Sequence, residues 1–585
     1  MNIKSICFTA MASLALASCN TKPAEADLVV LFTTDVHGAC LAHDIKKNAP
    51  AQTSLANVST YLKEVRQENP GKVLLFDTGD FLQGQPSMYY YNFVDTLTNH
   101  VCAASYNYLE YDALGVGNHD IETGEEVYNG RLPKQFKMPW LSANAIDTRT
   151  GQPMFQPYAV FERQGVKIAV LGMITPHIGA WLPKELWRNL EFEDMVECAR
   201  KWVPIIQKKE HPDLLIGLFH AGADYKTNGN DLDTPFNENG SIPAAIKVAG
   251  FDLCLLGHDH NPQLTSVVNV AGDTVQIMDA GTQARKVGRA DIHLTLKADG
   301  KYAKQMKTAL VDMKDFAPDS AYVTAFQSYV DAANHYVDSP IGQLTADLYG
   351  MEGLVGPSAF IDLVHDAQLW ATKADISLTP VLSPYDDILA GDITMRHLFI
   401  LYKYENLLYT IQMKADEVRK YLEFGFAMQF ATMNSANDHL MSFKPFKEGE
   451  RPQLAGISFN FTSAAGIKYV VDLTKEPGNR VRLVSMSDGS PIDPDKLYSV
   501  AINSYQYSGG GNFIPEGLGW DKEMLASRTL NTSTIDVRRY VEQYIREMGT
   551  ITPHVRGDWS IEPKKWYEAA KERDLKILQN KSLYH

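Results

Sequence analysis

The sequence contains little cysteine and no long apolar segment beyond its first residues. Six of its 585 residues are cysteine, and they lack the dense, regular spacing of a small domain held by disulfides. No apolar run after the N-terminus reaches the roughly 20 residues of a membrane-spanning helix. Positive charge is also scarce, because 55 Lys and Arg stand against 70 Asp and Glu and give a net charge of −15. This balance argues against a protein that coats DNA or RNA through phosphate contacts.

What the chain does contain is typical of a globular protein. Hydrophobic residues make up 45%, aromatic residues 10% and charged residues 21%, so the chain is neither disordered nor of low complexity. A length of 585 residues is too great for one hydrophobic core and predicts two large domains. If such an acidic chain binds a phosphate, the positive charge must be local and come from metals or a few placed side chains.

The first residues have the pattern of an export signal. A short basic start precedes an apolar stretch at 6–17, and Leu16-Ala17-Ser18-Cys19 resembles the lipobox of bacterial lipoproteins. We therefore predict a lipoprotein signal peptide over 1–19, with Cys19 lipidated. The mature protein is then exported and lipid-anchored at the bacterial periplasm or cell surface, and the anchor is its only membrane contact. The alternative is an ordinary secretory signal in which Cys19 has no special role.

Residues 27–314 alternate short apolar runs with amphipathic helical stretches. Runs of this kind, rich in β-branched residues and bounded by Gly or Asp, predict strands buried on both faces. The predicted strands are residues 28–32, 73–76, 168–172, 214–218 and 253–256. The pattern indicates a layered α/β domain.

The second half has mixed periodicities that predict a smaller α+β domain over 341–563. A polar helical stretch within 315–340 is expected to connect the two domains, and 564–585 forms a charged tail. Within the second domain we expect a helix near 417–426 and strands near 467–473 and 498–502. The turn at Asp488-Gly489 fits the meeting of these two strands.

Residues that bind divalent metals follow the predicted strands of the first domain. In open α/β sheets, the loops at the carboxyl ends of the strands meet to form the site. These segments offer Asp, Asn and His side chains as ligands but no Cys. Such a set suits two divalent ions of the Zn, Mn, Fe or Mg kind rather than a structural zinc. The segments are Asp35-Val36-His37, Asp77-Thr78-Gly79-Asp80, Gly117-Asn118-His119-Asp120, His220 and Gly257-His258-Asp259-His260.

In this order the segments resemble the motifs of the calcineurin-like dinuclear metallophosphoesterases. Together with the second half, the chain resembles the bacterial 5′-nucleotidase and 2′,3′-cyclic-nucleotide 2′-phosphodiesterase superfamily. The resemblance implies a β-sandwich flanked by helices, followed by a smaller α+β domain that binds the nucleotide. It also implies two groups of metal ligands and one bridging residue, namely Asp35, His37 and His260 for one metal, Asn118, His220 and His258 for the other, and Asp80 between them.

Two metals in such a site would generate a bridging hydroxide that attacks phosphorus, and would polarise the phosphoryl oxygens. His119 lies next to a ligand but has no metal assigned to it. We expect it to stabilise the developing charge or to protonate the leaving oxygen. A carboxylate would orient His119. Glu122 has the spacing found in the nucleotidases that the chain resembles, and Asp120 is the alternative.

The family holds the nucleobase between two aromatic residues of the second domain. The matching segments here predict Tyr404 and Tyr505 as the stacking pair and Asn406 as a hydrogen-bonding partner of the base edge. Stacking of this kind contributes roughly 1–3 kcal/mol per base. The predicted partner is thus a nucleotide, a small molecule rather than a nucleic-acid polymer.

The sequence departs from the 5′-nucleotidases at the ribose site. Gly509-Gly510-Gly511 stands where those enzymes carry Gly-Gly-Asp, so the ribose-binding acid is absent. This favours 2′,3′-cyclic-nucleotide 2′-phosphodiesterase/3′-nucleotidase activity. The alternatives are a 5′-nucleotidase or UDP-sugar hydrolase, and a binding lipoprotein that retains the fold without the chemistry. The native metal and the base preference stay open at this point.

Overall fold

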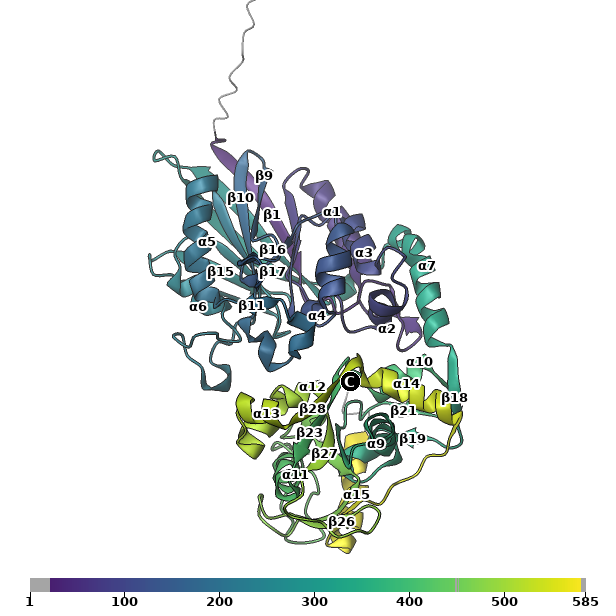
Figure 1. Ribbon diagram of the computed structural model, residues 1–585. Helices are drawn as coiled ribbons and strands as arrows, with labels where there is room; N and C mark the ends of the chain where they lie inside the picture. The colour runs from purple at the N-terminus through teal and green to yellow at the C-terminus, as the bar shows by residue number, and fades with distance from the viewer. Residues whose placement is uncertain (1–21, 448–449, 451, 580–585) are drawn as a thin grey trace, which may run out of the picture.

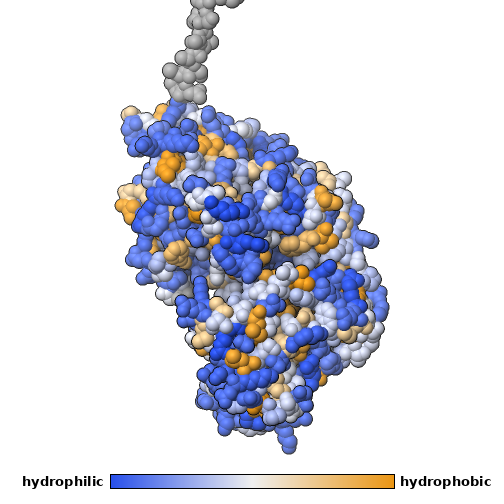
Figure 2. Space-filling view, in the orientation of Figure 1, coloured by the Kyte–Doolittle hydropathy of each residue, from blue (hydrophilic) through white to orange (hydrophobic). Residues whose placement is uncertain are grey.

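The computed structural model describes residues 22–579 apart from 448, 449 and 451. The predicted signal peptide and Cys19 therefore lie outside the described residues. Two domains are joined by the long helix α7 (Ser320–Val337), which runs along one side of the molecule (Figure 1). Hydrophilic residues cover most of the face shown in Figure 2, and hydrophobic ones form only small groups there. Within the described part of the chain, a search for helices long and apolar enough to cross a bilayer finds none.

The first domain is a sandwich of two six-stranded sheets. The first sheet has the order β17 (Tyr302–Asp312), β16 (Lys286–Leu296), β1 (Glu25–Thr33), β4 (Val73–Asp77), β5 (Ala113–Gly115) and β6 (Trp140–Leu141). The second has the order β14 (Gln263–Val268), β15 (Thr274–Asp279), β13 (Leu253–Leu256), β12 (Leu214–His220), β10 (Val166–Ile174) and β9 (Tyr158–Arg163).

Apolar side chains fill the space between the two sheets. Val30, Phe76, Val170 and Ile216 are fully buried there. The outer face of the first sheet packs against α1 (Leu55–Glu68) and α3 (Val101–Leu109). The outer face of the second packs against α5 (Met195–Glu210) and α6 (Ser241–Lys247). Because both faces of each sheet are covered, the central strands are continuous apolar runs. The predicted layered α/β class is confirmed.

Parallel pairing places the ends of the central strands at one edge of the sandwich. β1 pairs with β4, and β4 with β5, all in parallel. In the other sheet β10, β12, β13 and β15 are parallel neighbours. The loops that leave their carboxyl ends therefore lie together, on the side that faces the second domain (Figure 1).

The second domain is built around a five-stranded sheet and a smaller three-stranded sheet, with two further small sheets beside them. The larger has the order β24 (Thr462–Ala465), β20 (Ile376–Pro380), β27 (Tyr498–Asn503), β23 (Leu407–Met413) and β28 (Thr529–Asp536). The smaller has the order β26 (Val481–Met486), β25 (Ile467–Asp472) and β30 (Trp559–Glu562). Its main helices are α9 (Ala359–Thr372), α11 (Ala415–Gln429), α14 (Val537–Met548) and α15 (Lys564–Gln579).

One predicted strand pairing is wrong. The strands near 467–473 and 498–502 both exist, as β25 and β27, but they belong to different sheets. β25 pairs with β26, and the turn at 488–489 leads from β26 into the larger sheet. The sequence pattern did not indicate β26 because its apolar residues, four of the six, do not alternate strictly with polar ones and only Val481 is buried. An edge strand of this kind gives a weak periodic signal.

Candidate metal centre and substrate pocket

The predicted ligands at the ends of β1 and β13 form one group. His37 Nε2 and His260 Nε2 lie 2.9 Å apart. Asp35 Oδ1 is 3.3 Å from His260 Nε2 and 3.9 Å from His37 Nε2. Asp35 is fully buried, and its carboxylate also accepts the backbone N–H of His258 at 3.0 Å. Two imidazole nitrogens and a carboxylate thus converge on one point.

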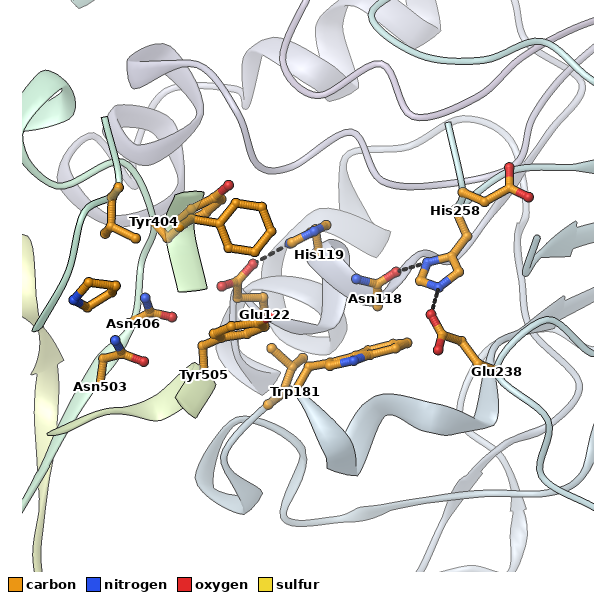
Figure 3. Close-up of a pocket in the computed structure, with 15 residues that line it drawn as sticks. Asn118, His119, Glu122, Trp181, Glu238, His258, Tyr404, Asn406, Asn503 and Tyr505 are labelled. Atoms are coloured by element: carbon orange, nitrogen blue, oxygen red, sulfur yellow. Dashed lines mark hydrogen bonds and ion pairs between the residues drawn. The ribbon is translucent and has the colours of Figure 1, made fainter. Parts of the chain in front are cut away.

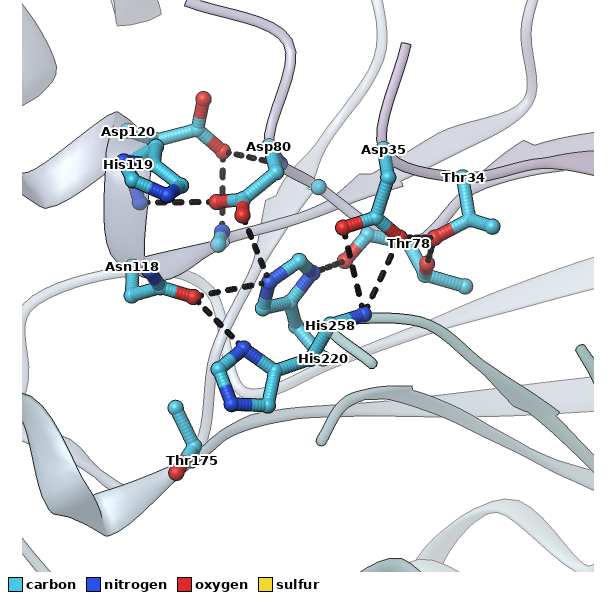
Figure 4. A network of polar contacts seen from close by, with 12 residues as sticks. Thr34, Asp35, Thr78, Asp80, Asn118, His119, Asp120, Thr175, His220 and His258 are labelled. Atoms are coloured by element: carbon cyan, nitrogen blue, oxygen red, sulfur yellow. Dashed lines mark hydrogen bonds and ion pairs between the residues drawn. The ribbon is translucent and has the colours of Figure 1, made fainter. Parts of the chain in front are cut away.

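The other predicted ligands form a second group beside the first (Figure 4). His220 Nε2 is 3.1 Å from Asp80 Oδ2 and 3.1 Å from Asn118 Oδ1. Asn118 Oδ1 is also 2.9 Å from His258 Nδ1. His220 is fully buried and fixed from behind by the carbonyl oxygen of Thr78, 3.1 Å from Nδ1. Asp80 adjoins both groups, because its carboxylate reaches His220 and also lies within 4.8 Å of a ligand atom of Asp35.

Five of the seven predicted ligands have a left-handed backbone, with φ between 46° and 86°. Non-glycine residues rarely adopt this conformation, and it is concentrated at functional sites where the surrounding structure imposes it. All five lie in the loops that follow β1, β4 and β13, close to the carboxyl ends of these strands. The residues are Asp35, His37, Asp80, His258 and His260.

The chemistry of these residues fits divalent ions. Two three-residue groups, Asp35-His37-His260 and Asp35-Asp80-His220, each have their ligand atoms within 4.8 Å of one another. His37 Nδ1 is buried and has no hydrogen-bond partner among the described residues. Carboxylate, imidazole and amide donors together are typical of catalytic Zn and Mn sites. The structure therefore contains a candidate site for divalent metal, consistent with the predicted ligands.

The site is electrostatically coupled. Burial opposes the charge on Asp80, but His220 and His119 outweigh it and hold the pKa of Asp80 well below its usual range. Burial also opposes protonation of His220, while Asp80 and Asp35 raise its pKa to about 9. For His37, burial dominates and lowers the pKa to about 4. Neutral His37 can therefore act as a metal ligand at neutral pH.

His119 is paired with Glu122. Its Nδ1 lies 2.5 Å from Glu122 Oε2, one helical turn away on α4 (Asn118–Ile121) and its C-cap. Burial would lower the pKa of His119, but Asp80 and Glu122 raise it to about 10. This contact leaves Nε2 as the nitrogen available to a substrate.

Asp120 does not contact the His119 ring. Its fully buried carboxylate accepts four backbone N–H groups at 2.8–3.1 Å, those of Gly117, Asp80, Phe81 and Leu82. It thus binds the loop after β4 to the start of α4. Of the two predicted partners of His119, Glu122 lies beside the ring, whereas Asp120 binds backbone N–H groups.

A cavity of about 300 Å³ opens beside the metal ligands and is lined by both domains. Asn118, His119 and His258 line it from the first domain, and Tyr404 and Tyr505 from the second (Figure 3). The predicted phosphate and base sites therefore belong to one cavity. Asn406 also lines it, and its side-chain amide lies 3.3 Å from the Tyr402 hydroxyl.

Several lining residues were not predicted from the sequence, and three of them contact predicted site residues. Phe459 is nearly perpendicular to both Tyr404 and Tyr505, at 71° and 72° and with ring centroids 6.3 and 6.2 Å away. Trp181 lies over His258, 5.2 Å between centroids. Glu238 Oε1 is 3.3 Å from His258 Nε2 and can orient that ring. All three lie outside the motif segments and outside the predicted helices and strands, so no periodicity or spacing indicated them.

The fold and the site together define a metal-dependent phosphoesterase. Residues 28–262 match the family model of the calcineurin-like phosphoesterases, and residues 340–516 match that of the 5′-nucleotidase C-terminal domain. The chain belongs to the hydrolases that combine these two domains. Proteins with the calcineurin-like domain use divalent metals.

Several known proteins resemble nearly the whole chain. The trifunctional nucleotide phosphoesterase protein YfkN of Bacillus subtilis is 27% identical over 92% of this chain, which spans 39% of that longer protein. The 2′,3′-cyclic-nucleotide 2′-phosphodiesterase/3′-nucleotidase of Yersinia enterocolitica is 25% identical, covering 94% of this chain and 90% of its own. The 5′-nucleotidase of Vibrio cholerae is also 25% identical, covering 90% and 95%.

A solved structure shares the fold of both domains. The putative 5′-nucleotidase of Staphylococcus aureus, in complex with alpha-ketoglutarate, has a TM-score of 0.74 at 18% identity, covering 92% of this chain and all of its own. This likeness confirms the predicted fold, and the two family models confirm the predicted family.

Proposed function

We propose that this protein hydrolyses nucleotides, with 2′,3′-cyclic-nucleotide 2′-phosphodiesterase/3′-nucleotidase activity. The shared cavity supports this most strongly, because His119 and His258 face it from one domain and Tyr404 and Tyr505 from the other. A nucleotide lying between the domains can place its phosphate beside the metal ligands and its base beside the tyrosines. Pockets at domain interfaces are a common location for small ligands.

In this proposal the site holds two divalent ions, such as Zn or Mn. Asp35, His37 and His260 would hold one ion, Asn118, His220 and His258 would hold the other, and Asp80 would contribute to both. When bound, such ions supply Lewis-acid activation of water and of the phosphoryl group.

The protein's own side chains would position the substrate and move protons. Tyr404 and Tyr505 stack on the base, and Asn406 hydrogen-bonds to its edge. Glu122 holds His119 Nδ1, so that Nε2 can stabilise charge on the phosphoryl oxygens or donate a proton to the leaving oxygen. The aromatic walls and the buried ligand loops would surround the reacting phosphate and lower the local dielectric constant, which strengthens these interactions.

The glycine run near Tyr505 supports the cyclic and 3′-nucleotide preference. Gly510 packs so closely under the Tyr505 ring that an added Cβ would lie 2.5 Å from it. Gly511 has a φ of 70° and offers no carboxylate to bind a ribose diol. A free 2′,3′-diol is the feature that 5′-nucleotides present and that 3′- and cyclic nucleotides lack. A 5′-nucleotidase or UDP-sugar hydrolase is the second candidate, supported by the 5′-nucleotidase names among the relatives.

A substrate panel tests the proposal. Protein loaded with Mn or Zn is assayed for phosphate release from 2′,3′-cyclic AMP, 3′-AMP, 5′-AMP and UDP-glucose. We expect the highest kcat/KM for the first two substrates. Preference for 5′-AMP or UDP-glucose would move the assignment to the second candidate, and no hydrolysis of any substrate would favour a binding protein.

Replacing either stacking tyrosine tests the base site directly. Tyr404→Ala or Tyr505→Ala should remove roughly 1–3 kcal/mol of stacking, about tenfold to a hundredfold in kcat/KM for nucleotides. Bis-p-nitrophenyl phosphate, which has no base, should lose much less. Equal losses for both substrates would instead indicate that the tyrosines support the fold.

We further propose that the protein is exported and lipid-anchored through Cys19. Labelling of expressing bacteria with a palmitate analogue should modify the wild-type chain and not Cys19→Ser. Labelling of both chains, or of neither, would contradict the anchor.

A further inference from the structure

Arg538 is a buried cation directly behind the Tyr404 loop. It lies on α14, and 1% of its side chain is exposed. Its guanidinium donates to the carbonyl oxygens of Tyr402 at 3.0 Å and Lys403 at 2.8 Å, and lies 3.4 Å from Glu405 Oε1. The contacts therefore include the residues on both sides of Tyr404.

The loop that carries Tyr404 has no regular structure of its own. α10 (Met395–Leu401) ends before it, and β23 begins after it. Its conformation therefore depends on contacts from neighbouring elements, and two of its backbone carbonyls are bound by the guanidinium of Arg538. A buried cation bound to these carbonyls resists displacement, because losing them would leave it unsatisfied.

One aromatic ring from each domain covers the same guanidinium. Arg538 lies 4.1 Å from the centroid of the Phe399 ring and 5.2 Å from that of Tyr89. Tyr89 ends α2 (Pro86–Tyr89) in the first domain, and its hydroxyl donates to Asp536 Oδ2 at 3.2 Å. Cation–π contacts of this kind are stronger when they are shielded from water. Closure of the two domains thus completes the environment of Arg538.

A lysine could not make the same set of contacts. The planar fork of arginine reaches two carbonyls at once and stacks on aromatic faces, whereas an ammonium group offers a compact point charge. The arrangement is therefore specific to Arg538, and not merely to positive charge at that position.

We propose that Arg538 is a positioning residue that sets the Tyr404 wall of the base site, and that Tyr89 links this wall to the apposition of the domains. The inference rests on the proposed stacking by Tyr404. It predicts that substitutions outside the cavity, at Arg538 and at Tyr89, weaken binding of the base itself.

Binding of adenosine to metal-free protein tests this without catalysis, with uridine as a second probe. Arg538→Lys should weaken binding about tenfold, close to the effect of Tyr404→Ala, and Tyr89→Leu should weaken it at least about threefold. The matched control is Arg539→Lys, because Arg539 is the next residue, is 44% exposed and pairs only with Glu542 among the ion pairs of the described residues. Thermal unfolding checks that each variant is folded.

The outcomes separate this inference from the proposed function. If Tyr404→Ala binds the nucleosides as tightly as wild type, the base site is wrong and this inference is lost with it. If Tyr404→Ala weakens binding while folded Arg538→Lys and Tyr89→Leu do not, only the role of Arg538 is refuted. If Arg538→Lys fails to fold, Tyr89→Leu provides the test. A loss of nucleoside affinity below about threefold in that variant refutes the link between Tyr89 and the Tyr404 wall. Equal weakening in Arg539→Lys would also refute it.

Discussion

Asp80 is held at the centre of the site through both carboxylate oxygens. Oδ1 accepts the backbone N–H of His119 at 2.8 Å, and Oδ2 lies 3.1 Å from His220 Nε2. Gly117 leaves room for this carboxylate, because an added Cβ would lie 2.1 Å from Oδ1. The glycine before Asn118 is therefore required by close approach, and it fixes Asp80 against the loop that carries His119.

Removing this carboxylate should disable the whole centre. We expect Asp80→Ala to bind less than half the metal of wild type and to lose at least about a thousandfold in kcat, because one side chain is proposed to serve both ions. Metal content after dialysis, measured by mass spectrometry, and phosphate release are the readouts. Asp315→Ala, at an exposed carboxylate, is the control. Full activity with metal bound would end the two-metal proposal.

Glu122 and Asp120 should give different defects. Glu122→Gln keeps the shape of the side chain but weakens its hold on His119, so we expect kcat to fall about tenfold to a hundredfold with metal content unchanged. Asp120→Asn should lower metal content and thermal stability, because an amide oxygen and an NH₂ group cannot accept all four backbone donors. Metal analysis beside kcat separates the two. An unchanged kcat in Glu122→Gln would remove Glu122 from the proposed mechanism.

At the scale of secondary structure, the sequence predicted the parts of the fold that are fully buried. β1, β4, β10, β12 and β13 are apolar runs covered on both faces, and all appear where expected. β26 was missed because partial burial leaves little periodic signal. The sequence also could not predict which sheet each strand joins, since pairing between β25 and β30 joins segments about ninety residues apart.

The site was predictable to a similar extent and for a related reason. Residues such as His37 and His258 lie shortly after buried strands, so their position indicated them as candidates, and the family resemblance implied their assignment as metal ligands. Their left-handed backbone was not predictable, because it is imposed by the neighbouring loops and not by residue type. Glu238 and Phe459 reach the pocket only through tertiary structure.

His365 on α9 connects the helix to two strands of the larger sheet. Its Nδ1 lies 2.9 Å from Ser377 Oγ, and its Nε2 lies 3.1 Å from Ser463 Oγ. The Ser377 hydroxyl donates to Gln368 Oε1 at 2.7 Å. Its oxygen therefore accepts a hydrogen bond from His365 Nδ1–H, and His365 Nε2 accepts one from the Ser463 hydroxyl. The network therefore suits the neutral imidazole, and burial lowers the pKa of His365 to about 3.

This histidine should make the protein less stable in acid. The unfolded chain binds a proton below the usual pKa of about 6.5, whereas the folded chain does not until about pH 3. Stability from His365 is therefore present above pH 6.5 and is lost as the pH falls, by roughly 2 kcal/mol at pH 5. We expect His365→Gln to show a smaller loss of unfolding free energy between pH 7 and pH 5 than wild type. His335→Gln, at an exposed histidine, should behave as wild type, and an unchanged slope in His365→Gln would refute the assignment.

At the scale of the whole molecule, polar contacts tie the two domains together around the cavity. Lys46 Nζ lies 3.0 Å from Asp386 Oδ2, and the Tyr409 hydroxyl donates to Glu185 Oε2 at 3.1 Å. Because these two contacts lie at partly exposed positions, breaking them should cost little free energy. Because the cavity lies between the domains, we expect substrate to enter and product to leave through such an opening.

Locking the domains should therefore slow turnover more than it weakens binding. A reductant-cleavable bismaleimide between Lys46→Cys and Asp386→Cys, added in the presence of adenosine, would hold the two domains together. The four cysteines of the described residues are buried, and each single-cysteine variant treated alike controls for stray labelling. We expect kcat for 3′-AMP to fall at least about tenfold while the equilibrium Kd for adenosine changes less than about threefold. Product release requires the two domains to open, whereas the contacts that bind the nucleoside do not. Cleaving the linker should restore kcat. An unchanged kcat in fully cross-linked protein would show that substrate exchanges without separation of the domains.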